Sequence, residues 1–497
     1  MTEYSIEEKI GQLIIPRLDF NDPKFDAQHA EHLIRKFHIG NFIVFGGDVT
    51  RVIDTLNHLQ RISKDPILFS ADLERGLGQQ VKGATEFPYF MGLAEAAKGG
   101  SADLIFEVAQ ITAVESRAVG IHHNFSPVLD INNNRENPII NIRSFGEDAE
   151  TVTTCGLEYI KGLQKNGMLA TAKHFPGHGD TQIDSHEDLP VLQHSAARLE
   201  QIEFQPFRRA IEEGVDAIMV GHIAVPSLEP SDLPATMSKR ILTDLIRAQW
   251  NYTGLIVTDA MMMGAIANRF SEEEAISKVF AAGADQILIP VNVENACRCL
   301  KDLIQNNPEA LARLDKSVDR ILHAKKKSGL FENRFTDLQN AEKVVGSDTH
   351  KKIAQKIIKK SLVIRKGEWP DTFLQHDTAV WLIKTDRNSL DHLKSHLKNM
   401  TVFETEVKGE RILIPDLEKF AGIIIITDAK PMAWQKKNQL PEAVRKVMET
   451  QFQNKEHLLI SCGNPYIGDG LEHLSNFVCT FSSGVMAQEE IADRIRV

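Results

Sequence analysis

Eight short apolar segments recur through the first two-thirds of the chain, and most of them are followed by a polar loop and an amphipathic helical pattern. They span residues 11–18, 39–45, 66–71, 121–128, 169–173, 217–222, 254–258 and 285–290, and helical patterns cover residues 102–119, 151–166, 196–213 and 239–250. Short segments that are apolar on both faces are typical of strands buried in a parallel sheet. Eight strands alternating with helices predict a (β/α)8 TIM-type barrel over residues 1–345.

The last third of the chain has a different pattern. A basic helical stretch at residues 351–360 predicts a linker helix within 346–370. Apolar runs at 378–383, 422–427, 458–461 and 476–481 then alternate with helical patterns at 389–399, 441–453 and 486–496. This predicts a smaller α/β sandwich domain over residues 371–497. Because it carries few reactive side chains, we expect a role in structure or assembly.

Charge and cysteine usage limit the partners and the compartment. The 497 residues carry a net charge of −11, so no surplus of cations exists to neutralise nucleic acid or an anionic membrane. The five cysteines are scattered, which predicts reduced thiols. The N-terminus has no apolar core of a secretory signal, and no stretch approaches the roughly 20 apolar residues of a membrane span. These features predict a cytoplasmic protein.

Polar side chains follow the predicted strands at the point where each strand ends. They are Asp72, Glu74, Asp130, Lys173, His174, His222 and Asp259. In a barrel the carboxyl ends of the strands converge on one rim, where active sites form. Carboxylates at the ends of buried strands require a partner or a ligand. The pattern therefore predicts a catalytic rim.

One of these strands leads into a polar loop, Lys173-His-Phe-Pro-Gly-His-Gly-Asp-Thr-Gln-Ile-Asp-Ser-His186, whose proline and glycines exclude a continued strand or helix. Asp184 and His186 are two residues apart, so the carboxylate can accept the imidazole N–H, orient the ring and favour its protonated form. A cationic imidazole opposite the ionised carboxylate of Asp259 would form an acid–nucleophile pair.

A metal centre is the main alternative for this loop. His174, His178, Asp180, Asp184 and His186 are all possible ligands. However, the sequence has no H-E-x-x-H motif, and the spacing matches no standard closed zinc site. We therefore expect no metal and no cofactor, and His178 and Asp180 can equally brace the loop.

Lys173-His-Phe-Pro-Gly-His-Gly179 followed by Asp184-Ser-His186 resembles the signature loop of family 3 glycoside hydrolases, in the β-N-acetylglucosaminidase branch. Further matches run in the family's order over about residues 5–340, and the last third resembles the α/β sandwich of longer members. These matches are Ile10-Gly-Gln-Leu13, Asn124-Phe-Ser-Pro-Val-Leu-Asp130, Asn137-Pro, Arg143-Ser-Phe-Gly146, Pro234-Ala-Thr-Met-Ser238 and Gly254-Leu-Ile-Val-Thr-Asp-Ala-Met-Met-Met-Gly264.

The resemblance implies roles for individual residues. Asp259 would be the nucleophile, and His186 would be the acid/base with Asp184 as its partner. The substrate-binding residues would be Asp72, Arg143, Lys173, His174, His222 and Met263. The implied activity is a retaining exo-β-N-acetylglucosaminidase that removes terminal β-linked GlcNAc from peptidoglycan-derived fragments by double displacement.

The sequence departs from the family pattern at two places. The arginine after Asp72 comes early, at Arg75, and no basic residue follows between Leu77 and Gln80; Ala260 stands after the nucleophile where Asp or Trp is common. The first departure leaves the identity of the natural substrate open. The alternatives are a β-N-acetylglucosaminide phosphorylase, a β-glucosidase or β-xylosidase of the same family, and a non-catalytic saccharide-binding protein. The sequence does not determine the oligomeric state.

Overall fold

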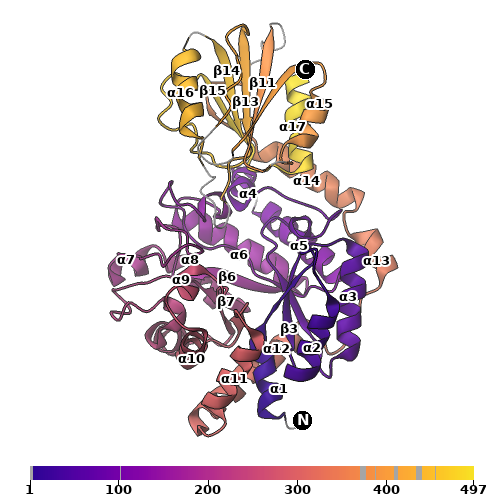
Figure 1. Ribbon diagram of the computed structural model, residues 1–497, viewed down its shortest axis with the longest axis vertical. Helices are drawn as coiled ribbons and strands as arrows, with labels where there is room; N and C mark the ends of the chain where they lie inside the picture. Colours follow the sequence, from indigo (N-terminus) through magenta and orange to yellow (C-terminus); the bar gives the residue numbers. More distant parts are fainter. Residues whose placement is uncertain are drawn as a thin grey trace. The chain divides into compact units, whose positions relative to one another are not determined.

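The computed structural model describes residues 4–100, 102–369, 377–386, 388–407, 412–431, 439–453 and 455–496 (Figure 1). The chain divides into two compact units. The barrel unit comprises Met1–Glu86, Ala102–Asn134 and Glu147–His350, and the sheet unit comprises Phe87–Ser101, Arg135–Gly146 and Lys351–Val497. A compact unit need not be an independently folding domain, so the boundaries near residues 345 and 370 stay a prediction. The second boundary falls on residues outside the described ranges.

The barrel unit is built on parallel strands that pair in chain order. They are β2 (Arg17–Asp19), β3 (Asn41–Phe45), β4 (Leu68–Ala71), β5 (His123–Asn124), β6 (Leu169–Phe175), β7 (Ala217–Val220) and β8 (Leu255–Thr258). The sheet closes through β1 (Ile14–Ile15), which precedes β2 and pairs with β9 (Ile287–Leu288). A bridge between Val257 and Gln286 joins β8 to the start of β9. The predicted barrel is confirmed, with one strand in each of the predicted segments and two, β1 and β2, in the first.

Helices surround these strands (Figure 1). They include α1 (Ile6–Leu13), α2 (Ala27–Phe37), α3 (Val49–Ile62), α5 (Asp103–Ala118), α6 (Ala149–Lys165), α7 (Ala196–Gln201), α8 (Gln205–Glu212), η4 (Arg240–Gln249, wound as a π-helix), α10 (Glu272–Ala282), α11 (Val293–Ile304), α12 (Pro308–Lys327) and α13 (Leu338–Val344). Several begin at a side chain that accepts a backbone N–H, as Asp26 does for α2 and Asn307 for α12.

Two sequence predictions in the barrel unit were wrong in detail. The strand predicted to begin at residue 11 begins at Ile14, because a capping box between Ser5 and Glu8 starts α1 at Ile6. The single helix predicted over 196–213 is two helices, α7 and α8, which are separated by Ile202–Phe204. Phe204 instead packs against Phe175 of β6 with ring centroids 5.4 Å apart.

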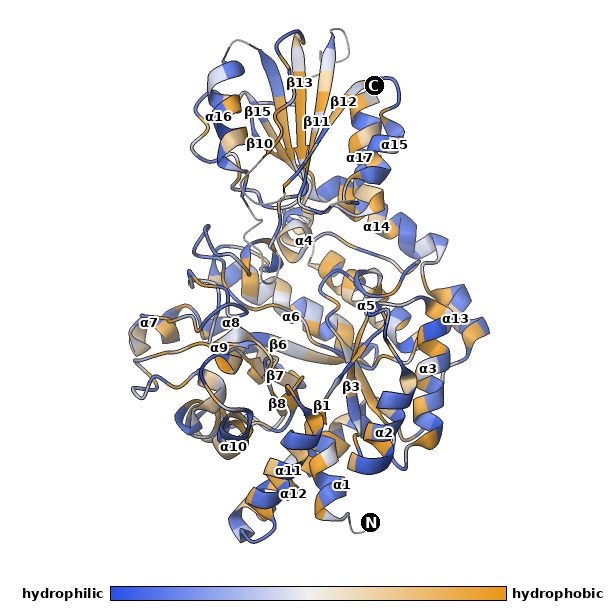
Figure 2. Cartoon of the chain, in the orientation of Figure 1, coloured by the Kyte–Doolittle hydropathy of each residue, from blue (hydrophilic) through white to orange (hydrophobic). Residues whose placement is uncertain are grey.

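The barrel strands are buried on both faces, as their composition predicted. Strands β6, β7 and β8 are buried along their whole length, and Figure 2 shows hydrophobic residues concentrated on β7 and β8. The charged residue on these strands, Lys173, lies toward the carboxyl end of β6. This arrangement leaves the rim as the place where reactive side chains gather.

The sheet unit contains a six-stranded sheet in the order β10-β15-β14-β13-β11-β12. The strands are β10 (Val363–Lys366), β11 (Thr378–Lys384), β12 (Thr401–Glu406), β13 (Gly422–Thr427), β14 (Glu456–Ser461) and β15 (Asn476–Cys479), and only β10 is antiparallel to its neighbour. One face packs on α15 (Asp391–His396) and α17 (Val485–Arg496), and the other on α16 (Glu442–Gln451). The predicted sandwich is confirmed.

The sequence analysis missed β10 and β12, and both lie at edges of the sheet. Their residues are largely exposed or half-buried, whereas β13 is buried throughout. An edge strand covered on fewer sides does not need a continuous apolar run. The helix α14 (Asp348–Ser361) covers the basic stretch that predicted the linker helix.

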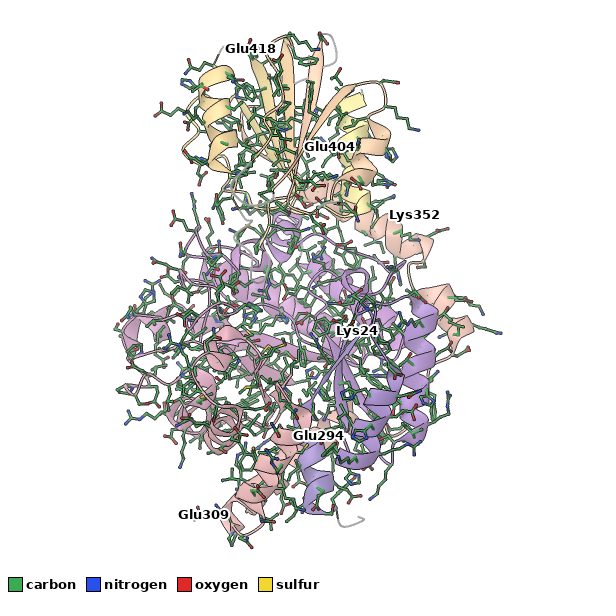
Figure 3. All side chains as sticks on the ribbon, in the orientation of Figure 1. Lys24, Glu294, Glu309, Lys352, Glu404 and Glu418 are labelled. Carbon is green, nitrogen blue, oxygen red and sulfur yellow. The ribbon has the colours of Figure 1, made fainter. Side chains whose placement is uncertain are left out.

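Charged side chains lie on the outside of each unit, as Figure 3 shows for Glu294 on α11 and Glu404 on β12. Glu294 contacts His32 and Lys36 of α2, each at 3.4 Å, and so links two neighbouring helices of the barrel. Among the described residues no helix combines the length and the apolar character that crossing a membrane requires. All five cysteines are free thiols, as predicted.

Candidate active site

The rim of the barrel brings together side chains from β4, β6, β7 and β8. Asp72 and Glu74 follow β4, and Lys173 and His174 are near the carboxyl end of β6. His222 follows β7, and Asp259 follows β8. The pairing of β6 with β7 shifts register between Lys173 and Phe175. Such irregularities at a barrel rim re-aim side chains, and this one coincides with His174.

Asp259 is the half-buried carboxylate at the end of β8. Within the described ranges, the Ala260 N–H is its one hydrogen-bond donor, at 2.8 Å to Oδ1, and no side-chain cation is close enough for an ion pair. Burial alone would raise the pKa of Asp259. Electrostatic interactions with His174, His222 and His186, together with the Ala260 hydrogen bond, outweigh burial and lower that pKa. The carboxylate is therefore ionised at neutral pH and is not saturated by protein donors.

His222 is fully buried and supports the turn after Asp259. Its Nε2 lies 3.1 Å from the carbonyl of Ala260, and its Nδ1 lies 2.9 Å from Thr236 Oγ1. Burial lowers the pKa of His222 despite the nearby charge of Asp259. A neutral ring that donates from Nε2 and accepts at Nδ1 satisfies both contacts. Its role as a substrate contact stays a prediction.

The loop after β6 presents the predicted Asp–His pair. His186 Nδ1 lies 2.8 Å from Asp184 Oδ1, and the same oxygen accepts the backbone N–H of His186 at 2.9 Å. Asp184 is buried, whereas the His186 side chain is 20% exposed. Because Asp184 holds Nδ1, the ring is oriented with Nε2 as the nitrogen able to exchange a proton with a substrate.

The base of this loop is anchored on Asp130, which is fully buried. Asp130 Oδ2 lies 2.7 Å from His174 Nδ1, and Oδ1 accepts the backbone N–H of His178 at 2.6 Å. Burial would raise the pKa of Asp130, but His174 and His178 lower it overall. A side chain at Gly179 would place Cβ 1.7 Å from the Ile131 carbonyl, so only glycine allows this close approach. The sequence placed Asp130 on the rim without assigning this role.

Lys173 joins the ends of two strands. Its Nζ lies 2.7 Å from Asp72 Oδ1 and 2.8 Å from Glu74 Oε1, and its side chain is only 2% exposed. Asp72 is 30% exposed, whereas Glu74 is 6% exposed. The sequence predicted Asp72 and Lys173 but gave Glu74 no role. Its position two residues after Asp72 at a strand end was the available signal.

Arg143 and Met263 are the two remaining predicted residues. Arg143 lies in η2 (Asn141–Arg143) of the sheet unit, where its Nη1 donates to the Ile139 carbonyl at 3.0 Å. Met263 is 1% exposed at the start of α9 (Gly264–Ala267), whereas its neighbour Met262 is 37% exposed. The sugar-binding roles of Arg143 and Met263 stay predictions.

The residues considered as metal ligands pair with other groups. His178 Nδ1 and Nε2 contact Thr181 Oγ1 at 2.6 Å and Ser185 Oγ at 2.9 Å, and Asp180 contacts His194 at 2.6 Å. His178 and Asp180 thus brace the loop. Across the part of the chain that the structure describes, no group of three or more His, Cys, Asp or Glu side chains is arranged to hold a metal ion.

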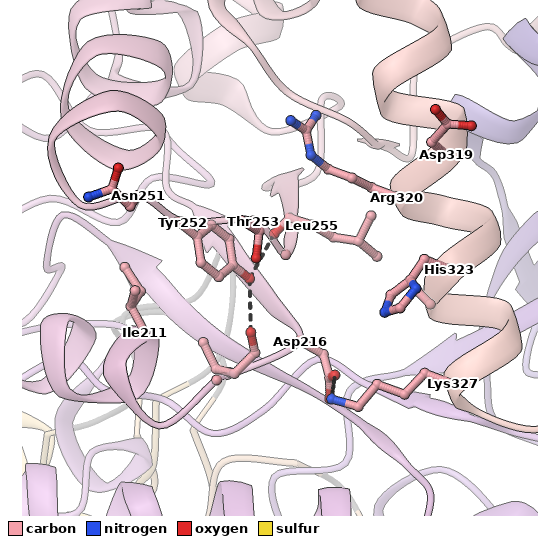
Figure 4. A pocket seen from close by; sticks show the side chains of 14 residues that line it. Ile211, Asp216, Asn251, Tyr252, Thr253, Leu255, Asp319, Arg320, His323 and Lys327 are labelled. Atoms are coloured by element: carbon pink, nitrogen blue, oxygen red, sulfur yellow. Dashed lines mark hydrogen bonds and ion pairs between the residues drawn. The ribbon is translucent and has the colours of Figure 1, made fainter.

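Two cavities in the barrel unit lie at different ends of the strands. One, of about 430 Å³, follows β2 and β9 at the rim, and its lining includes Arg17, Met262 and Pro290. The other, of about 440 Å³, precedes β7 and β8 and is lined in part by Asp216 and residues of α12 (Figure 4). Active sites of such barrels lie at the carboxyl ends of the strands. We therefore interpret the cavity beside Asp216, at the opposite end, as part of the scaffold.

The fold and the rim residues define a barrel hydrolase architecture with an appended α/β sheet. Residues 5–324 match the glycosyl hydrolase family 3 N terminal domain, and the chain belongs to that family. It is therefore a glycoside hydrolase.

Relatives and solved structures resemble the chain over most of its length. It is 33% identical over 377 residues to a beta-N-acetylglucosaminidase/beta-glucosidase of Cellulomonas fimi, covering 74% of this chain and 66% of that protein. It is 30% identical to beta-hexosaminidase A of Pseudoalteromonas piscicida, covering 90% of this chain and 83% of the relative. A family 3 beta-N-acetylglucosaminidase structure from Paenibacillus has a TM-score of 0.84 at 28% identity, covering 99% of this chain and 96% of that one.

Proposed function

We propose that this protein is a retaining exo-β-N-acetylglucosaminidase that removes terminal β-linked GlcNAc, from peptidoglycan-derived fragments in the cytoplasm. The observation that carries the proposal is the ionised carboxylate of Asp259 on the rim. Among the residues that the structure describes it has one hydrogen-bond donor, and the charge of His186, which pairs with Asp184, acts on it. The names of the Cellulomonas fimi and Pseudoalteromonas piscicida relatives support N-acetylhexosamine as the substrate class.

In the first step, Asp259 attacks the anomeric carbon of the GlcNAc residue. The glycosidic bond breaks as His186 Nε2–H transfers its proton to the leaving oxygen, and a glycosyl ester forms on Asp259. Asp184 keeps the imidazolium oriented through its contact with Nδ1. Two carboxyl groups usually do this work in retaining glycosidases. A histidine donor avoids a second anion beside Asp259.

In the second step, neutral His186 takes a proton from water, and the hydroxide oxygen attacks the same carbon. The ester bond to Asp259 breaks, and β-GlcNAc is released with the enzyme restored. Asp72, Lys173 and His174 would hold sugar hydroxyls, with Glu74 fixing the Lys173 ammonium. Arg143 and Met263 complete the proposed set of sugar contacts, together with His222.

Phosphorolysis is the second candidate. The acid/base is a histidine, and two further imidazoles, His174 and His222, act on Asp259 electrostatically. A site with imidazoles repels an incoming phosphate less than a site with a second carboxylate. Phosphate in place of water would yield GlcNAc-1-phosphate from the same glycosyl ester.

A panel of 4-nitrophenyl β-glycosides of GlcNAc, glucose and xylose, assayed with and without phosphate, tests the proposal. We expect GlcNAc to be the preferred sugar, free β-GlcNAc to be the first product by NMR, and EDTA to leave the rate unchanged. Accumulation of GlcNAc-1-phosphate would establish phosphorolysis instead. A preference for glucose or xylose would reassign the substrate, and undiminished turnover by Asp259→Ala would remove the proposed mechanism.

A further inference from the structure

The segment that follows the nucleophile contacts the acid/base loop directly. Helix α9 begins five residues after Asp259. The backbone N–H of Gly264 donates to the His186 carbonyl at 3.1 Å, and that of Ala265 donates to the Ser185 carbonyl at 3.2 Å. Two successive peptide groups at the start of α9 thus hold the backbone of the residue proposed to be the acid/base.

Gly264 makes this contact sterically possible. A Cβ at this position would lie 2.6 Å from the carbonyl oxygens of both His186 and Glu187, and 3.0 Å from Asn268 Nδ2. Two of these three atoms belong to backbone that cannot move without displacing His186. Any side chain at Gly264 therefore requires the acid/base loop to move away from α9.

Side chains after α9 extend the contact along the loop. Asn268 Nδ2 donates to the Glu187 carbonyl at 3.3 Å, and Arg269 donates to Asp188 Oδ1 from Nε at 3.1 Å and Nη2 at 2.9 Å. Ala265 also packs in a small buried cluster with Leu189 of the loop. Residues 264–269 therefore contact each residue of the segment 185–189.

We propose that Gly264 is a positioning residue and that residues 264–269 form a latch, which holds His186 in the place from which it protonates the leaving group. The latch ties the acid/base to the chain segment that carries the nucleophile. The inference rests on the proposed function, because it assigns the latch to the acid/base step. The position of a loop can complete a catalytic site, and small displacements of a catalytic group reduce rates strongly.

The test compares Gly264→Ala with Gly100→Ala, where the new Cβ would meet only the Ala97 carbonyl at an ordinary 3.6 Å. The substrates are 2,4-dinitrophenyl β-GlcNAc, whose leaving group needs little protonation, and phenyl β-GlcNAc, whose leaving group needs an acid. For Gly264→Ala we expect kcat/KM to fall at least about tenfold on the phenyl glycoside and less than about threefold on the dinitrophenyl glycoside. Gly100→Ala should match the wild type on both.

A double-mutant cycle with His186→Ala gives a readout that a general loss of structure would not produce. If the latch acts through His186, adding Gly264→Ala to His186→Ala should cost no further activity on the phenyl glycoside. Additive losses, or equal losses on both glycosides, would overturn the latch. So would an unchanged phenyl glycoside rate in Gly264→Ala.

If Gly264→Ala does not fold, the double variant Asn268→Ala/Arg269→Ala weakens the same contact from an exposed surface, and it should show the same selective loss with a smaller amplitude. If that variant matched the wild-type rate on each of the two glycosides, the result would contradict the latch. Failure of the proposed function is a separate result, because wild-type enzyme would then release no dinitrophenol from the GlcNAc glycoside.

Discussion

Asp259 and Asp285 lie at opposite ends of the two strands that close the barrel, β8 and β9. Asp259 has one hydrogen-bond donor within the described ranges. Asp285 is fully buried and has four, which are the Ser317 hydroxyl at 2.6 Å, the Ile256 N–H at 2.9 Å, Arg320 at 3.0 Å and Arg247. The barrel thus saturates one carboxylate and leaves the other able to react.

The same contrast extends to the side chains around each carboxylate. Near Asp285, Asp216 pairs with Lys327 at 2.5 Å and accepts the Ala170 N–H at 3.1 Å, as Figure 4 shows for the ion pair. At the rim, three imidazoles act on Asp259 without forming an ion pair with it. Buried charge is therefore a scaffold feature where partners satisfy it and a catalytic feature where they do not.

The largest expected effect is on catalysis at Asp259. In Asp259→Asn the isosteric amide cannot form the glycosyl ester, so kcat/KM should fall at least about 10⁴-fold. The free energy of unfolding should change by no more than about 1 kcal/mol, because only one hydrogen bond is altered. Steady-state kinetics and urea denaturation measure both quantities. A large fall in the free energy of unfolding with only a modest fall in kcat/KM would show that Asp259, like Asp285, is mainly structural.

Asp285→Asn should have the opposite profile. Removing one partner of a buried, multiply bonded charge costs about 3–5 kcal/mol, because Arg247 and Arg320 keep their charges without the carboxylate. We expect the free energy of unfolding, measured by urea denaturation, to fall by this amount. The kcat of the fraction that remains folded should stay within about twofold of the wild type, and a catalytic defect beyond that would contradict a purely structural role.

His174→Asn tests whether the imidazoles set the charge state of Asp259. His174 is the strongest of the charges that lower the pKa of Asp259, so its removal should raise that pKa. Activity is lost as the pH falls through the pKa of the nucleophile. The acidic limb of the kcat/KM profile should therefore move to higher pH. The matched control, His222→Asn, should shift the limb less, and no shift in either variant would contradict this electrostatic role.

The smallest effect is expected at Asp216. Burial raises the pKa of Asp216, with the Lys327 contact only partly offsetting it. A carboxyl whose folded pKa is raised binds more protons when folded, so wild-type protein should gain stability as the pH falls through that pKa. Asp216→Asn should lack this gain and differ from wild type by about 1 kcal/mol or less at pH 7, with kcat unchanged. Parallel pH dependence of unfolding in the two proteins would contradict the assignment.

Sequence reasoning located the barrel strands and the rim, because burial on both faces and the polar residue that ends each strand are local signals. It also located the Asp184–His186 pair, whose members are two residues apart. It gave no role to Glu74 and did not foresee Asp130 as the anchor of the loop. Their partners Lys173 and His174 lie 99 and 44 residues away in the sequence, and no local pattern encodes which rim groups meet.

By itself, then, the sequence determined which segments become strands, which residues end them and which family the chain resembles. It placed Asp259 after an apolar run and Asp285 at the start of one, but it could not show that hydrogen bonds would saturate Asp285 and not Asp259. Only the tertiary structure decided that difference. The donors that saturate Asp285 come from three separate segments of the chain, β8, η4 and α12, and the same folding brings no such donors to Asp259 among the described residues. Hydrogen bonding of a buried carboxylate depends on neighbours in space, which chain order does not specify.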